Sequence, residues 1–146
     1  MVDSRQKGAR AEYQVRDLFR EHTGHEWERT PMSGALSYLK TDIYIPHCEN
    51  NFAVEVKHYE EPILDIKILT NKSSKFTTFF NKVYEQAQER NQEPILVFKH
   101  NRSKFYVATQ VPPEHITTYL YIKWLDCYVM LLEEWLEKEP QEWKYG

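Results

Sequence analysis

Hydrophobic and polar positions along the chain recur with two different periods, and the change of period marks the expected helices and strands. Between residues 4 and 21 the spacing is that of one helical face, behind Asp3 or Ser4 as N-cap. Its members are Gly8, Ala11, Val15, Leu18 and Phe19. Residues 74–90 have the same period behind a Ser74 cap. Its members are Phe76, Phe79, Phe80, Val83 and Ala87. Both segments are therefore predicted as amphipathic helices.

Alternation with period two, which is typical of strands, occurs between these helices and after the second of them. The segments are HEWERT (25–30), DIYIP (42–46), FAVEVKHY (52–59), PILVF (94–98) and KFYVA (104–108). Turn-forming residues at 47–51 and 100–103 separate neighbouring strands. The N-terminal strands are thus expected to form a meander.

The remaining segments are less regular. Residues 60–73 fit an insertion, a short helix or a strand, and residues 119–124 fit a strand or the start of a helix. Residues 126–139 are predicted to be helical. The order helix, three strands, helix, two strands, helix predicts an α/β fold in which helices pack on a mixed central β-sheet. No repeat or linker divides residues 1–146, so a single domain is expected.

Composition narrows the class of protein. The chain has 146 residues, 41% of them apolar, which suits one globular core. No apolar run approaches the roughly 20 residues that span a bilayer, and the N-terminus lacks a signal-peptide core, so a cytoplasmic protein without membrane association is expected. Cys48 and Cys127 form no spaced ligand set, and two free thiols are expected.

The net charge of −3 argues against a protein that simply coats a polyanion, but the charge is unevenly distributed. Residues 57–104 carry nine Lys and Arg against six Asp and Glu, whereas residues 105–146 carry three against seven. A local basic surface is therefore compatible with the net acidity.

The strand 52–59 contains the first candidate chemistry. Because side chains alternate along a strand, Glu55 and Lys57 share one face. A surface ion pair would explain them if they stood alone. A short turn, however, brings Asp42 from the preceding strand beside Glu55. Two carboxylates at one strand edge, with the backbone carbonyl of Val56, supply the oxygen ligands that hard divalent cations such as Mg²⁺ require.

A further carboxylate, Glu12, lies within the apolar stripe of the first helix rather than on its polar face. A buried carboxylate is costly unless it is paired or binds a metal. A salt bridge to Arg16 or to another residue of the helix is one explanation. Ligation of the same metal as Asp42 and Glu55 is the favoured one. Lys57 would then orient or deprotonate a water, or stabilise charge on a phosphoryl oxygen.

The pattern Glu12, Asp42, Glu55-x-Lys57 resembles the PD-(D/E)xK nuclease motif, with Thr41 in place of its proline. The segments QKGARAEYQVRDLF, RTPMSGAL, TDIYIP and FAVEVKH resemble the archaeal-type Holliday junction resolvases and their phage-borne relatives. The resemblance implies a restriction-endonuclease-like core and a homodimer. It also implies Mg²⁺- or Mn²⁺-dependent hydrolysis of branched DNA, with Glu12, Asp42 and Glu55 as metal ligands and Lys57 as the catalytic lysine.

The same resemblance points to Ser33 as a catalytic or DNA-contacting residue, although Ser33 and Gly34 would equally explain a turn. Candidate phosphate contacts are Arg5, Lys7, Arg10, Arg29, Arg102 and Lys104. The quartet of acidic and basic residues also fits a restriction-like endonuclease or a recombination-associated exonuclease. A DNA-binding module without catalysis is a further alternative.

Overall fold

A computed structural model describes residues 4–31 and 41–145, with the side chains of residues 4 and 5 left out. Its centre is a seven-stranded mixed sheet, and only β4 and β5 in it run parallel. In spatial order the strands are β1 (Glu28–Arg29), β2 (Ile43–Tyr44), β4 (Phe52–Tyr59), β5 (Glu93–His100), β6 (Tyr106–Thr109), β8 (Cys127–Leu131) and β7 (Leu120–Ile122). The predicted mixed central sheet is confirmed.

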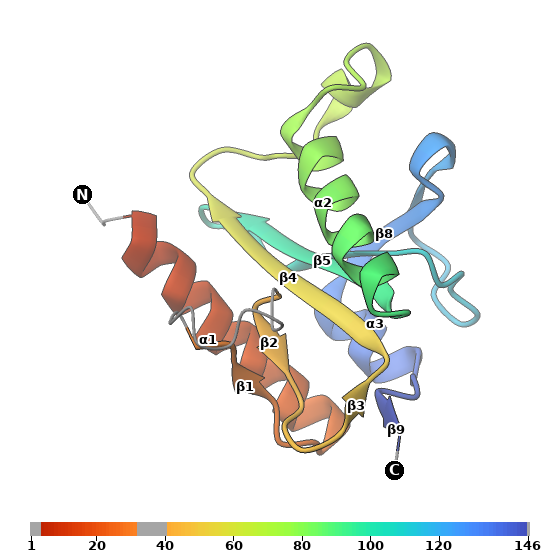
Figure 1. Ribbon diagram of the computed structural model, residues 1–146. Coiled ribbons are helices and arrows are strands. Elements are labelled where there is room, and N and C mark those ends of the chain that lie inside the picture. The colour runs from red at the N-terminus through yellow and green to blue at the C-terminus, as the bar shows by residue number, and fades with distance from the viewer. Residues whose placement is uncertain (1–3, 32–40, 146) are drawn as a thin grey trace.

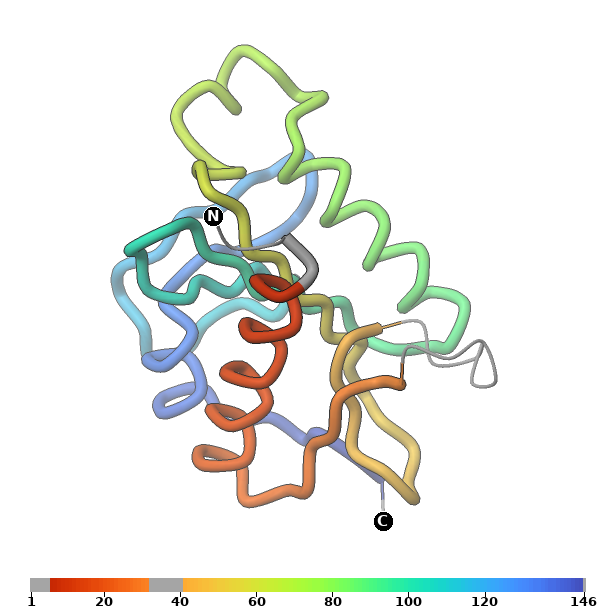
Figure 2. The backbone as a smooth tube through the Cα atoms, turned by 90° about the vertical axis from the view of Figure 1, so that its left-hand side faces the viewer, coloured from red at the N-terminus to blue at the C-terminus, as the bar shows by residue number. Residues whose placement is uncertain are grey.

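Helices cover both faces of this sheet (Figures 1 and 2). One face carries α1 (Ser4–Thr23) and α3 (Leu132–Lys138), and the other carries α2 (Lys75–Glu89). Strand β4 contributes apolar side chains to both faces of the sheet. Val54 and Val56 join the cluster under α1, and Ala53 joins the cluster under α2. Helix α2 begins as predicted, since the Ser74 side chain accepts a hydrogen bond from the Thr77 N–H.

Short elements complete the fold. A separate two-stranded sheet pairs β3 (Glu49–Asn50), within the predicted turn, with β9 (Lys144–Tyr145). The irregular segment 60–73 contains only the 3₁₀ helix η2 (Ile66–Leu69), and β7 is followed by the 3₁₀ helix η3 (Lys123–Leu125). No helix in the described part of the chain is long and apolar enough to cross a membrane.

The prediction of one helix over residues 126–139 is wrong. Residues 127–131 form strand β8, and the helix begins only at Leu132. In β8, Cys127 and Val129 face the α2 cluster while Met130 joins the α1 cluster, so both faces of the strand are buried. A strand buried on both faces has a continuous apolar sequence, which periodicity cannot distinguish from a buried helix.

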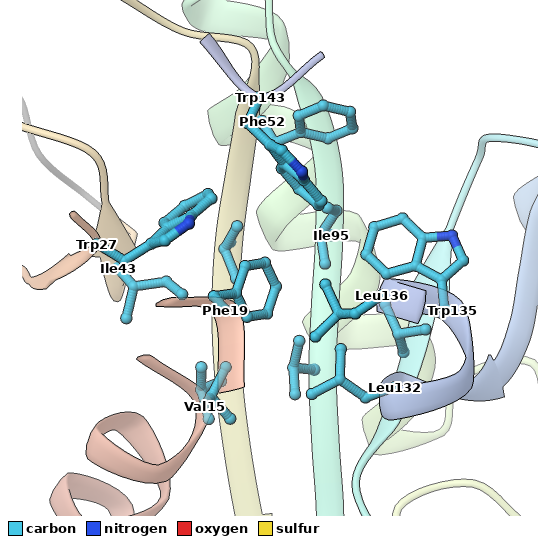
Figure 3. Packing of buried hydrophobic residues seen from close by; sticks show 14 of the residues in the cluster. Val15, Phe19, Trp27, Ile43, Phe52, Ile95, Leu132, Trp135, Leu136 and Trp143 are labelled. Atoms are coloured by element: carbon cyan, nitrogen blue, oxygen red, sulfur yellow. The ribbon is translucent and has the colours of Figure 1, made fainter. Parts of the chain in front are cut away.

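An aromatic cluster connects the C-terminal segment to the core (Figure 3). The Trp143 ring lies 4.8 Å from the Phe52 ring and 5.5 Å from the rings of Phe19 and Trp27, between centroids. It also meets Trp135 edge to face at 5.5 Å. Because Trp143 contacts side chains from α1, β4 and α3, it fastens the chain end across one face of the sheet.

Replacing Trp143 with Ala is expected to lower the free energy of unfolding by about 3–5 kcal/mol, because a large buried ring is removed and a cavity is left. Chemical denaturation measures this change. The matched control is Trp124→Ala: that side chain is 42% exposed, and its removal should change the stability by less than about 1 kcal/mol. Equal losses in the two variants would contradict the assignment of Trp143 to the core.

Candidate active site

Strand β2 stops pairing with β4 beside Asp42, and the edge of β4 is open beyond this point. We call the place where Asp42, Glu55 and the Val56 carbonyl meet the notch. The Asp42 N–H donates to the Val54 carbonyl at 2.9 Å, which places Asp42 opposite Glu55. The next ladder bond is missing, and the Val56 N–H donates to Oδ2 of Asp42 at 2.7 Å instead. The N–H and C=O of one strand residue point to the same side, so the Val56 carbonyl also opens on this edge.

Glu55 and Lys57 lie next to each other on β4, as their alternation predicts. Oε1 of Glu55 is 3.4 Å from Nζ of Lys57, whereas Oε2 is buried and lacks a hydrogen-bond partner within the described structure. Nζ of Lys57 also lies 4.8 Å from the centre of the Phe79 ring. Glu55 is only 8% exposed and Lys57 is partly buried, so this is not a surface ion pair.

Burial of two neighbouring carboxylates raises both pKa values. The pKa of Asp42 rises to about 8, mainly through burial and then through the charge of Glu55, although the Val56 N–H opposes the rise. The pKa of Glu55 is also raised by burial, against the opposing effect of Lys57. The notch therefore holds negative charge only at a cost, and a bound cation would offset that cost.

Glu12 approaches the notch from α1 but is held by another residue. Its Oε1 lies 3.4 Å from Nε of Arg29 on β1, while Arg16, the partner considered from the sequence, pairs with Asp17. The charge of Glu12 nevertheless contributes to the raised pKa values of Asp42 and Glu55. In residues 4–31 and 41–145, no three acidic, His or Cys side chains form a complete metal-ligand set as they stand.

The donor set at the notch still fits a hard divalent cation. Asp42 and Glu55 offer carboxylate oxygens and Val56 a carbonyl, and such oxygens are the ligands that Mg²⁺ takes together with water. The unpartnered Oε2 of Glu55 gives one ligand atom that no group of the described structure occupies. Glu12 would have to leave Arg29, or act through water, to take part.

Helix α2 adds residues that the sequence pattern did not select. The positive charge of Lys82 opposes the rise in the pKa of Glu55, so this lysine lies on the site side of the helix. Gln86, one turn later, has a buried Oε1 without a hydrogen-bond partner in the described structure, as does Thr30 Oγ1 beside Asp42. Only the packing of α2 on β4, which a lone sequence does not specify, could have identified Lys82.

The predicted DNA-contacting residues are spread over several places. Nζ of Lys7 donates to Oδ1 of Asn101, and Arg29 is engaged by Glu12. Arg102 is exposed in the turn between β5 and β6. Lys104 lines a groove of about 400 Å³ with acidic residues of α3, away from the notch. Ser33 lies outside the described residues, and the side chain of Arg5 is not among those described.

Comparison with known proteins finds a matching family, a relative and a solved structure. A family model described as phage putative PDDEXK endonuclease matches residues 3–142. Protein D14 of Escherichia phage T5 is 38% identical over 113 residues, which are 73% of this chain and 71% of that protein. The solved structure of Hjc, a Holliday junction resolvase from Archaeoglobus fulgidus, is 15% identical, with a TM-score of 0.47 over 86% of this chain and 88% of its own.

The raised pKa of Asp42 predicts how stability depends on pH in the absence of metal. Between pH 4 and 8 the folded protein retains a proton that the unfolded chain has lost, so stability falls as the pH rises through this window. Asp42→Asn keeps an acceptor for the Val56 N–H but cannot ionise. At pH 8 this variant should be about 2–4 kcal/mol more stable than the parent, and at pH 4 equally stable.

Urea denaturation at the two pH values, with EDTA present, measures this difference. Asp65→Asn, an exposed carboxylate that caps η2, is the control and should show no such gain at pH 8. A parent protein whose stability is constant across the window would show that Asp42 is ionised without cost.

Proposed function

The chain belongs to the phage PD-(D/E)xK endonuclease family, and from this premise we propose that it hydrolyses phosphodiester bonds of branched DNA with the help of a divalent metal. Four-way junctions are the proposed substrate, and the active form is a homodimer whose two sites act on two strands. The observation that supports this most directly is the notch itself: Asp42, Glu55 and Lys57 meet where β2 stops pairing with β4.

Each residue has a role that follows from its position. Asp42 and Glu55, with the Val56 carbonyl, would hold Mg²⁺ or Mn²⁺, which polarises a phosphodiester and makes water a better nucleophile. The side-chain nitrogen of Lys57 lies beside Glu55, where it can orient the attacking water or stabilise charge on the phosphate. Glu12, which is paired with Arg29, adds to the negative charge near the notch. It can also complete a second metal position through a water molecule.

The choice of branched DNA rests on the resemblance of the N-terminal segments to junction resolvases. The notch alone suits any DNA phosphodiester, because this core is compatible with many substrates. The homodimer rests on the same resemblance, since two cuts across a junction need two sites.

Cleavage of defined DNAs tests the substrate. With Mg²⁺, the protein is expected to cut a four-way junction in preference to linear duplex, flap and single-stranded DNA of the same sequence. Products are resolved on denaturing gels. Equal cutting of duplex would favour a restriction-like enzyme, and degradation from the ends an exonuclease. A protein that binds these DNAs and never cuts them would be a binding module.

Lys57→Ala is expected to lower the cleavage rate about 10²-fold or more, because the positioned ammonium is removed while the metal ligands remain. Lys123→Ala, at the opposite edge of the sheet, is the control and should cleave at the parent rate. Single-turnover cleavage of the junction gives both rates. Equal rates for Lys57→Ala and the parent would remove Lys57 from the mechanism.

Metal binding has a readout that does not depend on cleavage. Saturating Mg²⁺ or Mn²⁺ should raise the melting temperature of the parent at pH 8, since a ligand that binds only the folded state stabilises it. Asp42→Asn should lose most of this gain, and Asp65→Asn should keep it. A parent whose melting temperature does not respond to either ion contradicts the assignment of a metal site.

A further inference from the structure

A second group of functional side chains lies at the C-terminal end of β4, on the face opposite Lys57. Directly after Lys57, the alternation turns His58 toward the layer of α1. In the parallel register of β4 and β5, His58 lies beside Lys99, and the two share this face. Nζ of Lys99 is 5.1 Å from the centre of the Phe105 ring, which supports its side chain.

The first turns of α1 bring two more cations to this place. Nζ of Lys7 donates to Oδ1 of Asn101 at 3.0 Å, and Nε2 of His58 lies 3.1 Å from the same oxygen. Arg10 follows Lys7 by three residues on α1, so the two side chains lie on the same side of the helix. Burial lowers the pKa of His58, and the charges of Lys99, Lys7 and Arg10 add to this effect. We call Lys7, Arg10, His58, Lys99 and Asn101 the β4-end cluster.

No carboxylate of the described residues neutralises the positive charge of the β4-end cluster. Within residues 4–31 and 41–145, no carboxylate oxygen lies within 4.0 Å of the nitrogen atoms of Lys7, Arg10 or Lys99. Later on α1 the arrangement is different, because Arg16 pairs with Asp17 and Arg20 with Glu28. Three cations gathered from α1 and β5, without a counter-ion in the described structure, form a site for an external anion.

We propose that the β4-end cluster binds a backbone phosphate of the DNA, separate from the phosphate that is cleaved. The inference rests on the proposed function and deepens it. One strand leads directly from Lys57, at the notch, to His58, in the cluster, so DNA that reaches the notch passes the end of β4. Lys7, Arg10 and Lys99 give affinity without sequence preference, because they contact phosphate and not bases.

Binding measured as a function of salt concentration tests the proposal. The full chain is titrated onto a labelled four-way junction and a labelled duplex, with Ca²⁺ in place of Mg²⁺ to separate binding from cleavage. Lys99→Gln and Arg10→Gln should each bind both DNAs several-fold more weakly. The slope of log Kobs against log salt should become shallower by about 0.9 for each DNA phosphate that the variant no longer neutralises.

Lys123→Gln is the matched control, because this exposed lysine lies at the far edge of the sheet, and it should keep the parent affinity and slope. Thermal unfolding establishes that each variant is folded. In cleavage assays with Mg²⁺, the two cluster variants should raise KM and retain kcat, because the notch is intact. A fall in kcat at unchanged KM would place these residues in catalysis and overturn the proposal.

The outcomes separate this inference from the proposed function. If the parent cleaves DNA while Lys99→Gln and Arg10→Gln bind like Lys123→Gln, the phosphate site is wrong and the nuclease function stands. If the parent neither binds nor cleaves any of the DNAs, both proposals fall together.

Discussion

The hydrogen bond from the Val56 N–H to the Asp42 carboxylate determines the form of the site. It takes the place of the ladder bond that β2 would otherwise make, so the pairing of β2 with β4 ends at this point. Ending it there leaves the edge of β4 open from Val56 onward. The same bond fixes Asp42 opposite Glu55, so that one side chain both terminates the strand pair and forms half of the acidic notch. Because the bond comes from the backbone, neighbouring side chains can change without moving Asp42.

Burial gives this notch its chemical character. Two carboxylates in water would ionise independently, but here burial raises the pKa of both, and the charge of Glu55 raises the pKa of Asp42 further. Lys57 offsets only part of the charge, since it contacts one oxygen of Glu55 and leaves the other without a partner in the described structure. Part of the negative charge of the notch is thus not offset by Lys57. Preorganisation of this kind favours a ligand that brings positive charge and accepts oxygen donors.

Much of this arrangement could be predicted from the sequence because its determinants are local. Alternation alone places Glu55 and Lys57 on one face, and the short connection 47–51 brings Asp42 beside them. What could not be predicted depends on long-range packing. The partner of Glu12 is Arg29, which a helical wheel cannot show, and Lys82 reaches the site only through the packing of α2. Strand β8 resembles a helix in its sequence because burial on both faces removes its alternation.

The parallel pairing of β4 with β5 brings together residues that the sequence of either strand alone does not predict to be neighbours. It sets His58 beside Lys99, two residues separated in sequence by the whole of α2, and the first turns of α1 add Lys7 and Arg10. The notch and the β4-end cluster thereby adjoin consecutive residues of β4, Lys57 and His58, whose side chains lie on opposite faces of the sheet. The carboxylates of the notch on their own would repel a polyanion. In the proposed complex, the cations one residue further along provide the attraction that brings a phosphate backbone to an acidic site.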